Sequence, residues 1–128
     1  MDNKFYISLE AAMLLKEKGY NEVTNAAWNG FFGEMRISPQ NGGYRNLDYP
    51  DDIILYSAPT KAETIDWLES KGIVVEVVFD CNMQRWYFSI YKEEKTPWIK
   101  HLSNDTFPTR LEAEDAAIIR ALKEITKL

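Results

Sequence analysis

The chain has little of the residue chemistry that most metal and catalytic sites need. It holds one cysteine, Cys81, and one histidine, His101, among 128 residues. A single cysteine cannot form a disulfide within the chain, which fits a reducing compartment. One histidine and one cysteine also leave no pair with the spacing of a zinc site. We therefore expect neither a structural metal nor a cofactor.

Long apolar runs and an excess of positive charge are also lacking. No stretch approaches the ~18 apolar residues of a membrane span, and the first residues lack the apolar core of a signal peptide. Lys and Arg number 15 against 20 Asp and Glu, so the formal net charge is −5. This balance disfavours electrostatic binding to nucleic acid or anionic lipid. The sequence thus predicts a cytoplasmic protein that does not bind membranes.

Motifs for catalysis and phosphate binding are missing as well. No serine lies in a Gly-x-Ser-x-Gly turn, and the glycines of residues 30–43 have neither Walker nor dinucleotide-binding spacing. His101 falls on a predicted strand, where a solvent-facing histidine is the simpler interpretation. Asp48, Asp51 and Asp52 lie beside a proline and read as a solvated turn. We expect a protein that is not an enzyme.

Three segments carry the signals of helices, at residues 9–18, 61–71 and 111–127. Each follows a serine or threonine that can cap its first turn, namely Ser8, Thr60 and Thr109. Gly19 and Gly72 stand where the first two helices should end. The third segment repeats apolar residues along one stripe, Leu111, Ile118, Leu122 and Ile125, which is typical of a helix that covers a core.

Alternating apolar and polar residues predict a β-hairpin over residues 73–91. Residues 80–84 have the length of a hairpin connection, and a third strand is expected near residues 98–102. The expected fold class is α+β: a small, mainly antiparallel sheet packed by the three helices. We expect one globular domain over residues 1–128.

Residues 20–56 are the least legible part of the chain. Residues 34–37 are expected to form a short strand with a weak partner at residues 44–47. Residues 53–56 form an apolar segment after a turn. Trp28 comes just before the segment Asn-Gly-Phe-Phe-Gly, in which two glycines flank two phenylalanines.

Aromatic residues are the one suggestive excess, and they supply the candidate binding residues Trp86, Tyr87, Tyr91, Trp98 and Trp28. A sheet that is covered on one side buries only one face of each strand, so Tyr87 and Tyr91 are either covered by something else or exposed. Cross-strand packing explains such residues most simply. Exposed aromatics could instead anchor a protein partner or stack on the bases of a single-stranded nucleic acid.

Two strings in the chain look like a recurrent pattern. Residues 58–77 begin with Ala-Pro-Thr, continue with a predicted helix that contains Trp-Leu, and end in a β-branched strand. Residues 86–91 are followed, at residues 107–117, by the start of the third predicted helix. These strings resemble small uncharacterised proteins encoded by phages and integrated elements of gut anaerobic bacteria. The resemblance covers residues 58–127 and the helix at 8–19. It implies a phage or mobile element as genomic context, and it carries no activity or functional residues.

The sequence therefore predicts a small non-enzymatic protein that binds another protein. The partner would be a host protein or a second copy of the chain, because an exposed hairpin edge could pair two copies. If phage-encoded, the protein would be a host-modulating or defence-countering accessory protein. Two alternatives stay open: a module that binds single-stranded nucleic acid through strand aromatics, and a small enzyme with a carboxylate site that the sequence does not reveal.

Overall fold

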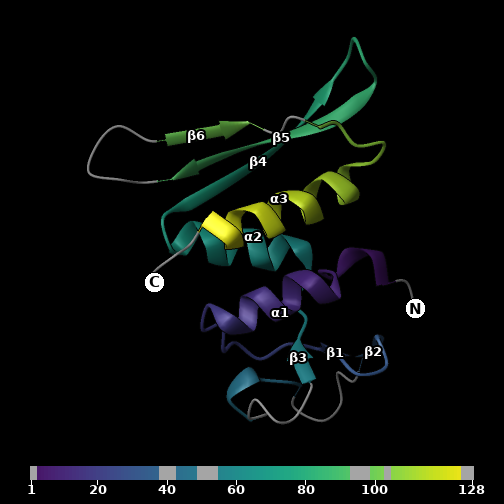
Figure 1. Cartoon of the computed structure of the whole chain (residues 1–128), viewed down its shortest axis with the longest axis vertical. Coiled ribbons are helices and arrows are strands. Elements are labelled where there is room, and N and C mark those ends of the chain that lie inside the picture. Colours follow the sequence, from purple (N-terminus) through teal and green to yellow (C-terminus); the bar gives the residue numbers. More distant parts are fainter. Residues whose placement is uncertain (1–2, 38–42, 49–54, 93–98, 103–104, 125–128) are drawn as a thin grey trace. The chain divides into compact units, whose positions relative to one another are not determined.

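The chain divides into two compact units, the first over residues 1–60 and the second over residues 61–126. The computed structural model describes residues 3–37, 43–48, 55–92, 99–102 and 105–124. Each unit combines helix with antiparallel sheet (Figure 1), so the α+β class predicted from the sequence is confirmed. The expectation of a single domain stays a prediction.

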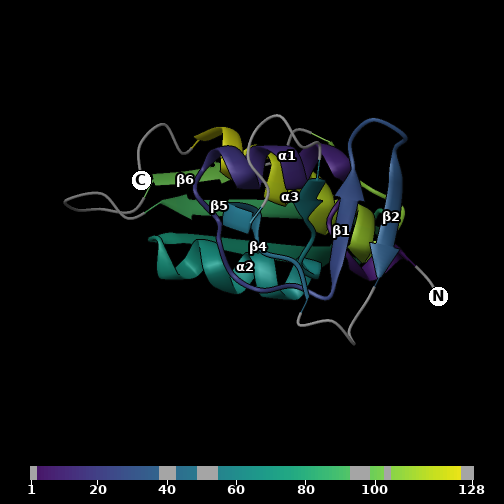
Figure 2. The ribbon, with the colours of Figure 1, turned by 90° about the horizontal axis from the view of Figure 1, so that it is seen from below.

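The first unit holds a helix and a three-stranded sheet of short strands. Helix α1 spans Leu9–Glu17 and contacts strand β3, Leu55–Ser57. Strand β1, Ala26–Asn29, lies between β3 and strand β2, Glu34–Ile37. Figure 2 shows β1 and β2 as neighbouring arrows joined by a turn. Two 3₁₀ turns, η1 at Asn3–Phe5 and η2 at Asn46–Asp48, complete the described part of the unit.

The strand expected at residues 34–37 is confirmed, but its expected partner at residues 44–47 is wrong. Strand β2 pairs with β1, from Ala26 opposite Ile37 to Asn29 opposite Glu34. Tyr44 instead forms an isolated bridge with Thr24, and residues 46–48 form η2. The sequence Ala-Ala-Trp-Asn of β1 has no β-branched residue, so it gave little strand signal. As a result β1, the central strand of the first sheet, was not predicted from the sequence.

A buried asparagine joins three separated parts of the first unit. Asn46 Nδ2 donates to the carbonyl of Tyr20 over 2.8 Å, and its Oδ1 accepts from the N–H of Ser57 at 2.9 Å. Asn46 is buried, so both bonds lie away from water. The loop that carries η2 is therefore fixed to the end of α1 and to β3 by one side chain.

The second unit is the part that the sequence predicted best. Strands β4, Ile73–Asp80, β5, Arg85–Lys92, and β6, Ile99–Leu102, form an antiparallel sheet in the order β4-β5-β6. Helices α2, Lys61–Ser70, and α3, Arg110–Glu124, pack on one face of this sheet (Figure 1). The predicted hairpin and the third strand are confirmed.

The ends of the helices follow the capping signals in the sequence. Ser8 Oγ accepts from the N–H of Ala11 at 3.3 Å, and Thr109 Oγ1 accepts from the N–H of Glu112 at 3.2 Å. Gly19 and Gly72 have φ values of +89° and +86°, as a residue that ends a helix requires. Along α3, Ile118 and Leu122 are buried as predicted, with three alanines: Ala113, Ala117 and Ala121. Ile125 and the expected end of the helix at residue 127 lie outside the described residues.

Candidate interaction site

The β1–β2 and β4–β5 hairpins close with the same four-residue turn. The last strand pairs are Asn29 with Glu34 and Asp80 with Arg85. In each turn, the side chain that ends the first strand accepts two backbone N–H groups. Asn29 Oδ1 accepts from the backbone N–H groups of the second and third turn residues, at 2.9 and 3.2 Å. Asp80 Oδ1 accepts from the backbone N–H groups of the second and third residues of its own turn, at the same two distances. A carboxylate and an amide oxygen thus specify the same turn.

The last turn residue adopts a left-handed conformation in both hairpins. Its φ is +67° at Gly33 and +53° at Gln84. Glycine takes this conformation without a steric penalty, whereas glutamine pays one. The β1–β2 turn is therefore the less strained of the two.

The two turns differ in the residues that they expose. The β1–β2 turn presents Phe31 and Phe32, whose exposed fractions are 74% and 68%. Their rings contact edge to face, with centroids 4.9 Å apart and an interplanar angle of 82°. The β4–β5 turn carries Asn82 and Met83 at the equivalent positions. The turn conformation therefore does not require two phenylalanines, and we call Phe31 and Phe32 the phenylalanine pair.

The phenylalanine pair is an exposed apolar group on a turn whose backbone is already ordered. Two hydrogen bonds to Asn29 hold the backbone beneath the rings, and the N–H of Gly33 donates to the Asn29 carbonyl at 2.8 Å. Burying one phenylalanine side chain contributes about 1.5–3 kcal/mol. A partner that covered both rings would gain that energy twice without first having to order the turn. Phe31 and Phe32 are thus two large exposed apolar residues that adjoin in sequence and touch through their rings.

Trp28, a residue singled out from the sequence, has a structural role next to this turn. It is half-buried in β1, and its Nε1 donates to the carbonyl of Ile7 at 2.8 Å. Its strand neighbours are Met35 on β2 and Tyr56 on β3. Trp28 thus ties the segment before α1 to the sheet of the first unit.

The other candidates are not gathered on one surface. Trp86 lies on the sheet face that α2 and α3 cover. The centroids of its ring and of the Phe79 ring are 5.2 Å apart. Tyr87 and Tyr91 alternate onto the opposite face, and both are half-buried. The Tyr91 hydroxyl donates to Glu76 Oε2 at 3.4 Å. Trp98 lies outside the described residues.

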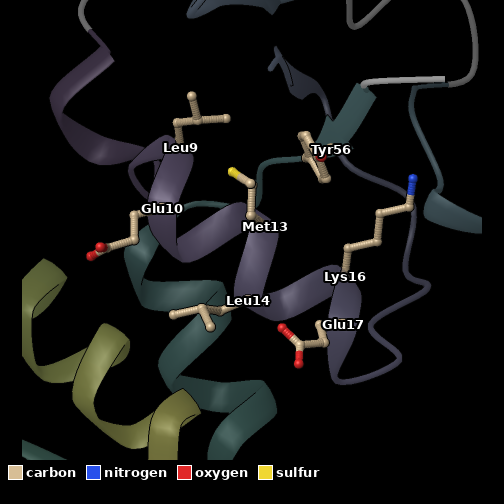
Figure 3. Close-up of a pocket in the computed structure, with 7 residues that line it drawn as sticks. All are labelled: Leu9, Glu10, Met13, Leu14, Lys16, Glu17 and Tyr56. Atoms are coloured by element: carbon tan, nitrogen blue, oxygen red, sulfur yellow. The ribbon is translucent and has the colours of Figure 1, made fainter. Parts of the chain in front are cut away.

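A shallow depression runs along α1 in the first unit (Figure 3). It is lined by Leu9, Glu10, Met13, Leu14, Lys16, Glu17 and Tyr56. Lys16 Nζ donates to the Leu55 carbonyl at 3.2 Å and lies 5.2 Å from the centre of the Tyr56 ring. This lysine therefore links α1 to β3, and its neighbours form no set of converging groups that would suggest a reaction.

Neither a metal site nor a membrane span is found in the described part of the chain. No group of three or more histidine, cysteine or acidic residues there could hold a metal ion. Within the same residues, each helix is too short or too polar to cross a bilayer. His101 is paired with Ile90 in the β5–β6 register.

Comparisons of the chain with protein-family models, with curated proteins and with solved structures find no match. A proposal about the function of the chain must therefore rest on its geometry alone. The phenylalanine pair was not predicted from the sequence, because Gly30 and Gly33 were interpreted only as turn residues. The signal was present, since two aromatic residues inside a tight turn have no core to enter.

Proposed function

We propose that the protein binds another protein and that the phenylalanine pair is the centre of the contact. One observation carries the proposal: both rings are exposed on a turn whose conformation the other hairpin reaches without them. Aromatic residues are frequent among the few that supply most of the binding energy at protein interfaces. The pair would enter an apolar pocket on the partner.

The charge around the turn favours a protein over a membrane as the partner. Residues 29–34 contain no lysine or arginine, and Glu34 follows the turn directly. Peripheral membrane segments usually combine exposed apolar residues with basic ones, since the lipid surface is negative. The net charge of −5 adds to this argument.

The alternative of a nucleic-acid-binding module gains less support. Tyr87 and Tyr91 lie on the sheet face that α2 and α3 leave open, where bases could stack in principle. Glu76 shares that face and contacts the Tyr91 hydroxyl. A carboxylate there would repel the phosphates of a bound strand. With the phage-type resemblance, we propose a host protein as the target and a host-modulating or defence-countering role.

The proposal is tested by capture from a nuclease-treated lysate of the bacterium that carries the gene. The bait is the full chain, either with its own sequence or with Phe31→Asn and Phe32→Met. These substitutions give the first turn the residues of the second, so the backbone hydrogen bonds are expected to stay. Leu47→Asn is the matched control, because Leu47 in the same unit is equally exposed.

We expect one protein to be retained by the native chain and by Leu47→Asn, and to be lost with the double variant. A captured protein that binds all three baits equally would refute the role of the phenylalanine pair. Retention from an untreated lysate that is lost after nuclease treatment would instead support the alternative module.

A further inference from the structure

The outer edge of strand β4 is long and regular. In the order β4-β5-β6, β4 is an edge strand of 8 residues, whereas the edge strands β2, β3 and β6 have 4, 3 and 4. Each residue of β4 faces one residue of β5, from Ile73 opposite Lys92 to Asp80 opposite Arg85. Within the residues that the structure describes, no strand pairs with the other side of β4.

The hydrogen bonds of Trp86 show which backbone groups of β4 point outward. The N–H and C=O of Trp86 bond to Phe107, at 2.9 and 2.8 Å, and so point away from β4. Trp86 and Phe79 therefore form a non-hydrogen-bonded pair. Because such pairs alternate along an antiparallel ladder, Ile73, Val75 and Val77 belong to non-hydrogen-bonded pairs as well. The N–H and C=O groups of these four residues face the outer edge.

This edge lacks the features that usually keep strands from pairing with another chain. Natural edge strands are protected by prolines, lysines, bulges or short length. The sequence Ile-Val-Val-Glu-Val-Val-Phe-Asp has no proline or lysine, and its one-to-one register with β5 leaves no place for a bulge. Five of its residues are β-branched, which favours pairing as a strand.

We propose that the outer edge of β4 pairs with β4 of a second copy of this chain to form an antiparallel, two-fold dimer. A two-fold axis perpendicular to the sheet passes midway between the two copies of one residue, which then face each other; this residue is said to lie on the axis. With Val77 on the axis, it exchanges hydrogen bonds with Val77 of the second copy. Val75 then faces Phe79, so all three residues use their outward N–H and C=O groups.

The charge of Glu76 selects this register over its neighbour. With Glu76 on the axis, two carboxylates would face each other in a non-hydrogen-bonded pair, whose Cα atoms are only ~4.5 Å apart. Like charges directly opposite destabilise a sheet. With Val77 on the axis, Glu76 faces Val78 of the second copy and Asp80 faces Val74. The strand is therefore complementary to itself in the Val77 register.

The test combines sedimentation with residue-resolved amide exchange of the full chain, from micromolar to millimolar concentration. We expect a monomer–dimer equilibrium in which the amides of Val75, Val77 and Phe79 exchange more slowly as the dimer forms. The amides of Val74, Glu76 and Val78 are the internal control, since they bond to β5 in either state. A monomer at every concentration would overturn the proposal, as would a dimer without concentration-dependent protection at these three amides.

A proline at the axis separates pairing from folding. Val77→Pro removes an N–H that β5 does not use, and prolines are accepted in edge strands at such positions. We expect the dimer Kd to rise roughly tenfold or more, because the central hydrogen-bonded pair is lost. Val77→Thr keeps the N–H and should dimerise normally. If Val77→Pro is folded and dimerises as tightly as the native chain, the register is refuted; if it does not fold, the exchange data on the native chain still decide.

Discussion

At the scale of the residue, Asn46 shows how one side chain can define an irregular segment. Its amide bonds to the backbone at residues 20 and 57, which lie far apart in the sequence. A polar pattern on the chain does not reveal such a role, because asparagine is usually read as a turn residue. The buried position of Asn46 is a consequence of tertiary structure alone.

We expect Asn46→Ala to destabilise the protein. The substitution removes the two buried bonds from Asn46 to the Tyr20 carbonyl and the Ser57 N–H, and each such loss costs about 1–3 kcal/mol. Chemical denaturation followed by fluorescence would measure the free energy of unfolding. Asn21→Ala is a suitable control, because Asn21 makes a similar bond to the Leu47 N–H at an exposed site. Equal losses in the two variants would contradict the importance of burial.

Both the backbone conformation at position 43 and the atoms close to it require glycine there. Its φ is +78°, and a Cβ atom built there would collide with the Thr24 carbonyl oxygen. Gly19 has a similar φ of +89°, but nothing lies within 4 Å of its Cβ position. We therefore expect Gly43→Ala to lower the melting temperature clearly more than Gly19→Ala, whose cost is the left-handed backbone alone, about 1–2 kcal/mol. A smaller shift for Gly43→Ala would mean that the Thr24–Tyr44 bridge is not as close as described.

At the scale of the element, the shared turn of the two hairpins supports a prediction about Gln84. This residue holds a φ of +53° that glycine holds at the equivalent place in the other turn. Gln84→Gly should raise the free energy of unfolding by up to about 1 kcal/mol, since relief of the left-handed strain exceeds the entropy cost of glycine. The reverse change, Gly33→Gln, should lower it. Thermal denaturation should show a higher melting temperature for Gln84→Gly and a lower one for Gly33→Gln. A loss of stability in Gln84→Gly would contradict the prediction.

The sequence predicted elements well where local signals agreed with the fold. Helix α3 has a cap, an apolar stripe and a favourable order of charges, and the β4–β5 hairpin has strict alternation around a polar connection. Strand β1 lacked such signals, because its two alanines are buried without strong strand preference. The exposed phenylalanines were also missed, because the flanking glycines were interpreted only as turn residues and the pairing of β1 with β2 was not predicted.

At the scale of the whole molecule, exposed apolar residues distinguish the two units. Large ones in the first unit include Phe5, Met13, Val23, Phe31, Phe32 and Leu47, and those in the second include Phe79 and Met83. Single exposed apolar residues are ordinary on soluble proteins, whereas adjoining ones mark interaction surfaces. The phenylalanine pair stands out because its two rings contact each other. The outer edge of β4 would serve assembly with a second copy, so a target protein and a second copy would use different surfaces.

The most direct test of the central claim is the affinity of the captured protein for the native chain and for the variant with Phe31→Asn and Phe32→Met, measured by calorimetry. Phe31→Asn removes the burial of one ring, about 1.5–3 kcal/mol, whereas Phe32→Met keeps an apolar side chain, so we expect the Kd to rise at least about tenfold in the double variant. Leu47→Asn should leave the Kd unchanged. An equal Kd for the native chain and the folded double variant would contradict the account.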